Sequence, residues 1–159
     1  HLRTEPIRGN VETRIGKVDA GLFDATLLAE AGLTRLDMKD VTRYPISEEI
    51  IVPAPGQAAI AVQTRDEDGE LQTLLQQIHD AKTEREVNIE RSLLKRLGGG
   101  CALPLGCVCH IEGEMAELRV FYANASGTEH YLATHRTPLS DIDTLLSQLI
   151  ERLQHITTA

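Results

Sequence analysis

The sequence contains very few aromatic residues and no tryptophan: Phe, Tyr and Trp make up only 3% of its 159 residues. Proteins that bind single-stranded nucleic acid stack bases on such side chains, and a phosphate-binding face needs an excess of positive charge. This chain has a net charge of -8, so we do not expect nucleic acid as a partner. Apolar runs near the ~20 residues of a membrane span and a signal-peptide pattern are also missing, so we expect no membrane partner.

Cysteine is scarce as well: the chain has three, an odd number. Free thiols in a reducing compartment, the cytoplasm, are the simplest interpretation. A metal site built from Cys101, Cys107, Cys109 and His110 is an alternative, but their spacing matches no standard zinc pattern. If 105–111 is a strand, Cys107 and Cys109 share one face and His110 points to the other. We therefore expect two small buried side chains and no metal.

The composition is that of a globular protein, with 42% hydrophobic and 25% charged residues. In the first part of the chain, Asn10 is a good N-cap for a helix over about 11–20, which Gly21 ends. The nearly continuous apolar stretch 23–29 predicts a strand buried on both faces. A short helix is expected over 30–37, which gives this part an α/β pattern.

The middle of the chain is predicted to hold a turn at Pro53–Gln57 that leads into a strand of small residues over 58–62. The charged stretch 64–69 marks a boundary. Beyond it, a capping box at Thr83–Glu86 is expected to open a long helix that stops at Gly98. The elements expected after the boundary form an α+β pattern: helices near 71–78, 83–97 and 142–153, the last after Pro138, and strands near 105–111, 116–123 and 130–136.

Cys101 is the most unusual residue, because it follows three glycines directly after a helix end. One glycine is enough to end a helix, so the others leave bare backbone around the thiol. A helix C-terminus carries partial negative charge, which raises a thiol pKa. A covalent attachment point formed once fits better than a turnover nucleophile. The alternative is an incidental cysteine in a flexible connection.

A second candidate site lies near the N-terminal end of the chain. Arg8 lies just before the N-cap Asn10, and Arg14 lies in the first turns of the same helix. A helix N-terminus attracts anions, and arginines add bidentate recognition of carboxylate or phosphate. Arg35, near the end of the next helix, is a further member. The alternative is that all three are solvated surface residues.

Taken together, the sequence resembles the porphobilinogen deaminase family, also called hydroxymethylbilane synthase, over nearly its whole length. The most specific part of the resemblance is Gly99-Gly100-Cys101 followed by Pro104, which is similar to the family's cofactor-attachment signature. The four matching segments occur in the family's order: Arg8–Arg14, Leu27–Leu36, Pro53–Ala59, and Glu90-Arg91 with Leu97–Gly106.

The resemblance implies an enzyme of tetrapyrrole and heme biosynthesis, a transferase that links porphobilinogen units head to tail and releases ammonia. It implies a dipyrromethane cofactor held by a thioether to Cys101, with Gly99 and Gly100 beside it. Every pyrrole of the substrate carries an acetate and a propionate. Arg8 and Arg14 match family arginines that bind cofactor and substrate carboxylates. Arg35 and, less closely, Gln57 match substrate-binding positions.

Two positions depart from the family pattern. Ala58 stands where the family usually has glycine, and alanine tolerates fewer backbone conformations than glycine does. Gln63 stands where the family often has an acidic residue. Neither departure alters the cysteine or the arginines named above.

The resemblance also implies how the domains are arranged. The expected fold class is an incomplete α/β lobe, similar to periplasmic binding proteins, followed by a small α+β domain whose three-stranded antiparallel sheet is covered by helices. Residues 1–45 correspond to the latter half of the family's second domain, 46–65 to a segment that returns to the first domain, and 66–159 to the C-terminal cofactor-attachment domain.

The family's catalytic aspartate has no matching motif here. We therefore expect the 159-residue chain by itself to be inactive, with the missing N-terminal lobe of the same protein as its natural partner. Full-length members are expected to be monomers. The alternative is a truncated, non-catalytic binding or interaction protein derived from this family.

Overall fold

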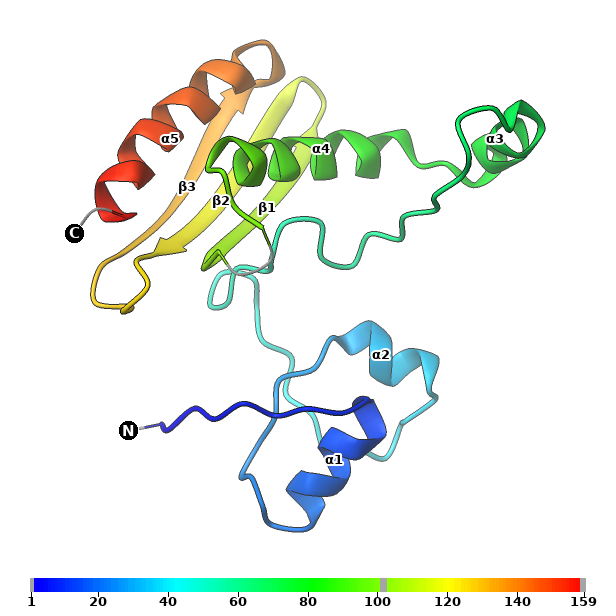
Figure 1. Cartoon of the computed structure of the whole chain (residues 1–159), viewed down its shortest axis with the longest axis vertical. Helices are drawn as coiled ribbons and strands as arrows, with labels where there is room; N and C mark the ends of the chain where they lie inside the picture. Colours follow the sequence, from blue (N-terminus) through cyan, green and yellow to red (C-terminus); the bar gives the residue numbers. More distant parts are fainter. Residues whose placement is uncertain (1, 101–102, 158–159) are drawn as a thin grey trace. The chain divides into compact units, whose positions relative to one another are not determined.

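A computed structural model describes residues 2–100 and 103–157 of the chain (Figure 1). The chain divides into two compact units, His1–Pro45 and Ile46–Ala159. Among the residues described, no helix is both long and apolar enough to cross a membrane.

The first unit is built on two short helices, α1 (Val11–Asp19) and α2 (Glu30–Arg35). The side chain of Asn10 accepts a hydrogen bond from the backbone N–H of Thr13 at 2.8 Å, so Asn10 is the N-cap, as predicted. Gly21 follows the helix with a φ of +71°, a left-handed conformation that favours glycine. The predicted helices at 11–20 and 30–37 are therefore confirmed, although the second is shorter.

The predicted buried strand at 23–29 is wrong. This stretch has no regular secondary structure, and the side chain of Leu27 is 67% exposed. A strand needs a neighbour to take up its backbone hydrogen bonds, and no other strand occurs among residues 2–45. The apolar sequence alone therefore did not produce a strand.

The second unit begins with helical elements. They are α3 (Gly69–Leu75), the 3₁₀ turn η1 (Gln76–Ile78) and α4 (Ala81–Arg96). The long helix does not open with a capping box at Thr83, as predicted. Instead Asp80 is its N-cap, because the Asp80 carboxylate accepts the backbone N–H of Thr83 at 2.7 Å. The N-cap thus lies three residues earlier than predicted, and Thr83 lies in the first turn of the helix.

The sheet has three antiparallel strands in chain order: β1 (Leu105–Glu112), β2 (Met115–Ala123) and β3 (His130–Pro138). In their register Cys107 lies opposite Val120, and Val120 lies opposite Ala133. The two connecting turns contain Gly113 and Gly127, both with positive φ. The three predicted strands and their turns are confirmed.

One face of the sheet is covered by α4 and by α5 (Ile142–Thr157), which follows the 3₁₀ turn η2 (Leu139–Asp141) (Figure 1). Side chains from these two helices and from alternate positions of the strands form the hydrophobic core. Its fully buried members include Leu93, Leu146, Leu153, Leu118, Val120 and Cys107. Cys109 is only 2% exposed, so the expectation that both strand cysteines are small core residues is confirmed.

The predicted strand of small residues at 58–62 is absent. This stretch is not regular, and the side chains of Ile60 and Val62 are 75% and 58% exposed. The α+β half of the predicted fold class is thus correct, since a three-stranded antiparallel sheet is covered by helices on one face. In residues 2–45 the structure contains helices and no sheet, so an α/β lobe similar to periplasmic binding proteins is not established.

Candidate functional site

The predicted attachment residue, Cys101, lies outside the described residues. The three glycines before it are described, and they do not all have the same role. Gly98 has a φ of +70°, and the N–H groups of Gly98 and Gly99 donate to the carbonyls of Lys95 and Leu94 at 3.0 and 3.3 Å. This pair of bonds is a Schellman motif that ends α4.

Gly99 and Gly100 differ in the space around them. A Cβ atom on Gly99 would lie 2.6 Å from Cδ2 of Leu103, whereas a Cβ on Gly100 would meet no atom of residues 2–98 or 103–157 within 4 Å. A side chain at Gly99 would therefore require Leu103 to move. No side chain of the described residues crowds Gly100, which agrees with a place in an attachment loop.

The basic candidates Arg8 and Arg14 lie together at the start of α1. The Arg14 Nε atom donates to the carbonyl oxygen of Gly9 at 2.9 Å, which leaves the two terminal nitrogens of its guanidinium group for a ligand. The side chain of Arg8 is exposed and forms no hydrogen bond or ion pair with any described residue. Both arginines therefore have donors available at a helix N-terminus, where the backbone also favours anions.

Arg35 ends α2, in the same unit. The two helices approach where a Cβ on Gly32 would lie 3.4 Å from a methyl carbon of Val11. Arg35 lies about one helical turn beyond Gly32 and is exposed. Within residues 2–100 and 103–157, no carboxylate lies within ion-pair distance of Arg8, Arg14 or Arg35.

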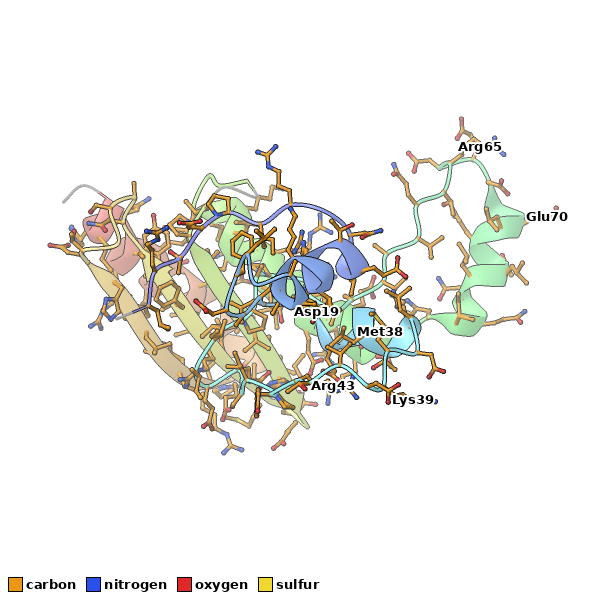
Figure 2. The ribbon with its side chains drawn as sticks, turned by 90° about the horizontal axis from the view of Figure 1, so that it is seen from below. Asp19, Met38, Lys39, Arg43, Arg65 and Glu70 are labelled. Carbon is orange, nitrogen blue, oxygen red and sulfur yellow. The ribbon has the colours of Figure 1, made fainter. Side chains whose placement is uncertain are left out.

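Arg43 of the same unit, labelled in Figure 2, provides a contrast, because it pairs with Glu30 at 3.1 Å. An arginine that is paired in this way is partly neutralised, whereas the three candidates keep their charge for an external anion. The arrangement can recognise carboxylate or phosphate groups.

Gln57 belongs to the second unit. Its N–H donates to the carbonyl of Ala54 at 2.9 Å, which closes the predicted turn, and its side chain is exposed. The neighbours of Gln57 have unusual backbone angles: φ is +75° at Gly56 and +69° at Ala58. Ala58 thus occupies a conformation that glycine adopts more easily.

A buried carboxylate that the sequence did not single out holds this turn in place. Glu90 of α4 is 6% exposed, and it accepts hydrogen bonds from the N–H of Gly56 at 2.6 Å and of Cys109 at 2.9 Å. Burial raises the pKa of Glu90 above its usual value, although the two N–H donors favour the charged form. The one sign of its burial in the sequence is its position close to Ile89 and Leu93, on the apolar side of a predicted helix.

The chain before the turn crosses the other face of the sheet. A Cβ on Gly106 would lie 2.5 Å from the carbonyl oxygen of Val52, so the backbones touch there. Close by, His110 Nε2 lies 2.6 Å from a carboxylate oxygen of Glu48, and Arg119 donates to the carbonyl of Glu49 at 2.6 Å. The turn that carries Gln57 is therefore attached to α4 on one side and continuous with a segment on the sheet.

The strand cysteines are not suited to catalysis. Burial raises the pKa of Cys109 to about 12 and raises that of Cys107 further, with the Glu90 charge as a second cause. Both are free thiols. The described residues hold no group of three or more metal-ligating side chains.

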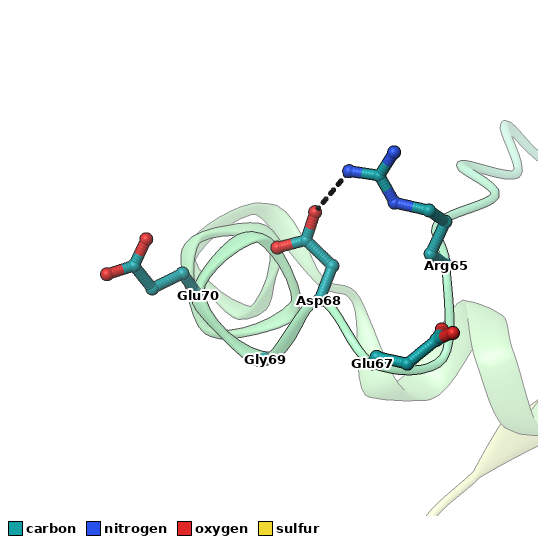
Figure 3. A pocket seen from close by; sticks show the side chains of 5 residues that line it. All are labelled: Arg65, Glu67, Asp68, Gly69 and Glu70. Carbon is teal, nitrogen blue, oxygen red and sulfur yellow. Dashed lines mark hydrogen bonds and ion pairs between the residues drawn. The ribbon is translucent and has the colours of Figure 1, made fainter.

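A shallow hollow of about 400 Å³ lies beside the start of α3, lined by Arg65, Glu67, Asp68, Gly69 and Glu70 (Figure 3). Arg65 is paired with Asp68 at 3.2 Å, which leaves two further carboxylates exposed. A net negative charge repels an anionic ligand. None of the residues predicted as site residues lines this hollow.

Comparison with protein families gives two matches. Residues 1–73 match the model described as "Porphobilinogen deaminase, dipyromethane cofactor binding domain". Residues 84–143 match the model described as "Porphobilinogen deaminase, C-terminal domain". The arginine candidates and Gln57 fall in the first match, and Glu90 and Cys101 fall in the second.

Proposed function

The chain belongs to the porphobilinogen deaminase family, and on this basis we propose that it forms the part of a hydroxymethylbilane synthase that holds the dipyrromethane cofactor and the carboxylates of the growing pyrrole chain. Full-length members are transferases of tetrapyrrole biosynthesis. Each addition of porphobilinogen forms one carbon–carbon bond, breaks the bond to its amino group and releases ammonia.

The observation that carries the proposal is the unpaired state of Arg8 and Arg14 beside the N-terminus of α1. Their free donors suit carboxylates, and every pyrrole of the substrate and of the cofactor bears two. A dipyrromethane brings four carboxylates, so a basic group without internal acidic partners fits it. Arg35 and Gln57 are proposed to contact substrate.

We assign the covalent attachment to Cys101. Two arguments support it: the residue stands in the attachment signature, and the other two cysteines are buried with raised pKa values. The cofactor, when bound, supplies the pyrrole end on which the chain grows. The part of this chain is then to anchor that group at Cys101, to leave room for it at Gly100 and to bind its carboxylates.

We further propose that residues 1–45 belong to a lobe similar to periplasmic binding proteins, that 46–65 form a connecting segment and that 66–159 form the attachment domain. The 159-residue chain by itself is proposed to be inactive, because no aspartate in it matches the family's catalytic aspartate. An N-terminal lobe of the same protein is its proposed partner, and the complete protein is proposed to be a monomer. Free thiols at Cys107 and Cys109 favour the cytoplasm.

A second candidate function is a non-catalytic binding protein derived from this family. Exposed large apolar side chains in each of the two units are the observation behind it, because such side chains can form the apolar part of an interaction surface. They include Leu22, Leu27, Ile60 and Val62, each more than half exposed.

Intact-mass measurement and a binding titration test the proposal. We expect a dipyrromethane adduct that the Cys101→Ser protein lacks. We expect porphobilinogen binding that falls in the Arg8→Gln and Arg14→Gln variants and stays unchanged in Arg43→Gln, whose arginine pairs with Glu30. A colour assay with an aldehyde reagent that reacts with pyrroles measures the turnover of porphobilinogen.

Binding without turnover by the chain alone, with turnover restored by an added N-terminal lobe, supports the enzyme. A chain that binds no porphobilinogen and carries no adduct contradicts it and favours the binding protein.

A further inference from the structure

Three consecutive residues before α1 are each held by a side chain of that helix. Lys17 Nζ donates to the carbonyl oxygen of Arg8 at 2.9 Å, and Arg14 Nε donates to that of Gly9 at 2.9 Å. The side chain of Asn10 accepts from the N–H and the hydroxyl of Thr13 at 2.8 and 2.6 Å. We call residues 8–10 the arginine loop.

The geometry of an α-helix explains how α1 reaches this loop. Side chains tilt toward the N-terminal end of their helix, and residues three or four apart lie on one face. Arg14 and Lys17 are three apart, so both side chains extend back along the same face toward the arginine loop. Lys17 is half-buried.

Arg8 depends on this anchoring. The bond from Lys17 is the one hydrogen bond that Arg8 forms with the described residues. The next residue, Gly9, has a φ of +123°, and a Cβ there would lie 2.7 Å from a methyl carbon of Thr13. Glycine is flexible in the unfolded chain, so ordering it costs conformational entropy. The hydrogen bonds to the carbonyl oxygens of Arg8 and Gly9 offset this cost and hold the loop in one conformation.

We propose that Lys17 is a positioning residue: by holding the Arg8 carbonyl, it presents the Arg8 guanidinium group to a ligand carboxylate. This inference rests on the proposed function, because that function makes Arg8 a carboxylate-binding residue. Lys17 itself binds the backbone, so its effect on binding passes through Arg8.

The test compares Lys17→Met, which keeps the length of the side chain and removes the donor, with Lys17→Arg, which restores a donor. Lys39→Met is the matched control. Lys39 projects from the loop after α2 (Figure 2), its side chain is 78% exposed, and it pairs with Asp37. In ¹⁵N-labelled 159-residue protein, the heteronuclear NOE at Gly9 and Asn10 reports the order of the loop without ligand. Titration with porphobilinogen, followed at the Arg8 signals, gives the affinity.

We expect Lys17→Met to lower the NOE at Gly9 and Asn10 and to weaken porphobilinogen binding by about 2- to 10-fold, as the loss of one hydrogen bond implies. Lys17→Arg restores both, and Lys39→Met changes neither. If Lys17→Met does not fold, as judged by its circular dichroism, Lys17→Gln takes its place, because its short side chain does not reach the carbonyl.

Unchanged loop order in Lys17→Met overturns the inference. This holds even if porphobilinogen binding becomes weaker, because weaker binding with an unchanged loop is an effect of the lost charge alone. Failure of Lys17→Arg to restore both also overturns it. If the unmodified protein binds no porphobilinogen, the proposed function fails, while the NOE comparison still decides whether Lys17 orders the loop.

Discussion

The backbone N–H of Gly56 donates to the Glu90 carboxylate at 2.6 Å, across 34 positions of the chain. The other oxygen of the same carboxylate accepts the N–H of Cys109 at 2.9 Å. One buried side chain of α4 thus connects the turn that carries Gln57 with strand β1.

Replacing Glu90 with glutamine should destabilise the second unit. A glutamine has one acceptor oxygen, and its NH₂ group would face a backbone donor, so one buried N–H loses its partner. We expect a loss of about 1–3 kcal/mol in the free energy of unfolding, measured by urea denaturation and by faster hydrogen exchange at Cys109.

Glu151→Gln is the matched control, because Glu151 is exposed on α5 and forms no hydrogen bond or ion pair with the described residues. Its unfolding free energy should stay near that of the unmodified protein. Equal stability of the two variants would show that the buried carboxylate does not hold the turn.

Replacing Ala58 with glycine should stabilise the chain. Alanine with a φ of +69° carries the steric cost of the left-handed region, about 1–2 kcal/mol. Glycine removes that cost but makes the unfolded chain more flexible, by about 0.4–1 kcal/mol. We expect a net gain of about 0–1.6 kcal/mol, visible as a higher midpoint of thermal unfolding.

Ala54→Gly is the control for this change. Ala54 lies in the same turn and has no positive φ, so glycine there adds only flexibility to the unfolded chain and should lower stability. The opposite signs of the two substitutions are the diagnostic result; a loss of stability in both would contradict the strain assigned to Ala58.

Stability should fall in mild acid because of His135. Its Nε2 atom lies 2.6 Å from the Tyr131 hydroxyl. Burial and, secondarily, the positive charge of Arg152 lower the pKa of His135 below its usual 6.5. The folded protein then binds this proton less readily than the unfolded chain does. The stability that neutral His135 contributes to the folded protein is present above pH 6.5 and is lost as the pH falls through the lowered pKa.

Urea unfolding from pH 7.5 to 5 in the unmodified protein and in His135→Gln measures this effect. The unmodified protein should lose more stability over that range, since the other histidines are common to both and cancel. Parallel pH profiles would mean that His135 does not titrate differently in the folded state.

Thiol chemistry should distinguish Cys101 from the other two cysteines. At pH 8 the buried thiols of Cys107 and Cys109 stay protonated, because burial raises the pKa of Cys109 to about 12 and that of Cys107 further. We expect iodoacetamide to modify no more than one thiol in the folded protein and all free thiols in urea.

The Cys101→Ser variant identifies the reactive site. It should take up no label when folded, and the unmodified protein should resist labelling to the extent that its mass shows an attached cofactor. Rapid labelling of the folded Cys101→Ser protein would contradict the burial of the strand cysteines.

The sequence predicted the second unit well because its elements stabilise one another. The apolar side chains of Leu118 and Val120 alternate along β2, and that strand has a partner on each side. Residues 23–29 and 58–62 are also rich in apolar side chains, but neither stretch pairs with a strand among the described residues, and both are irregular. Their secondary structure depended on neighbours that the local sequence does not show.

The candidate site was predictable only as residue types. Arg8 and Arg14 could be recognised from their place beside the N-cap Asn10. The roles of Lys17 and Glu90 could not be predicted, because each side chain bonds a backbone group that is distant in the sequence. The Arg8 carbonyl is 9 positions from Lys17, and the Gly56 N–H is 34 positions from Glu90. A lysine inside a helix and a glutamate on an apolar helix face are weak signals until the fold brings those backbone groups within reach.

The bonds to β1 have a consequence for association. A strand at the edge of a sheet normally offers free N–H groups to a strand from another molecule, which is a route to aggregation. On the outer side of β1 the N–H of Cys107 already bonds to the carbonyl of Pro53, that of Cys109 to Glu90 and that of Ile111 to Glu86. Another chain therefore finds no free donors at these three positions. Glu90, which attaches the turn, thus also helps to protect this edge against β-sheet extension.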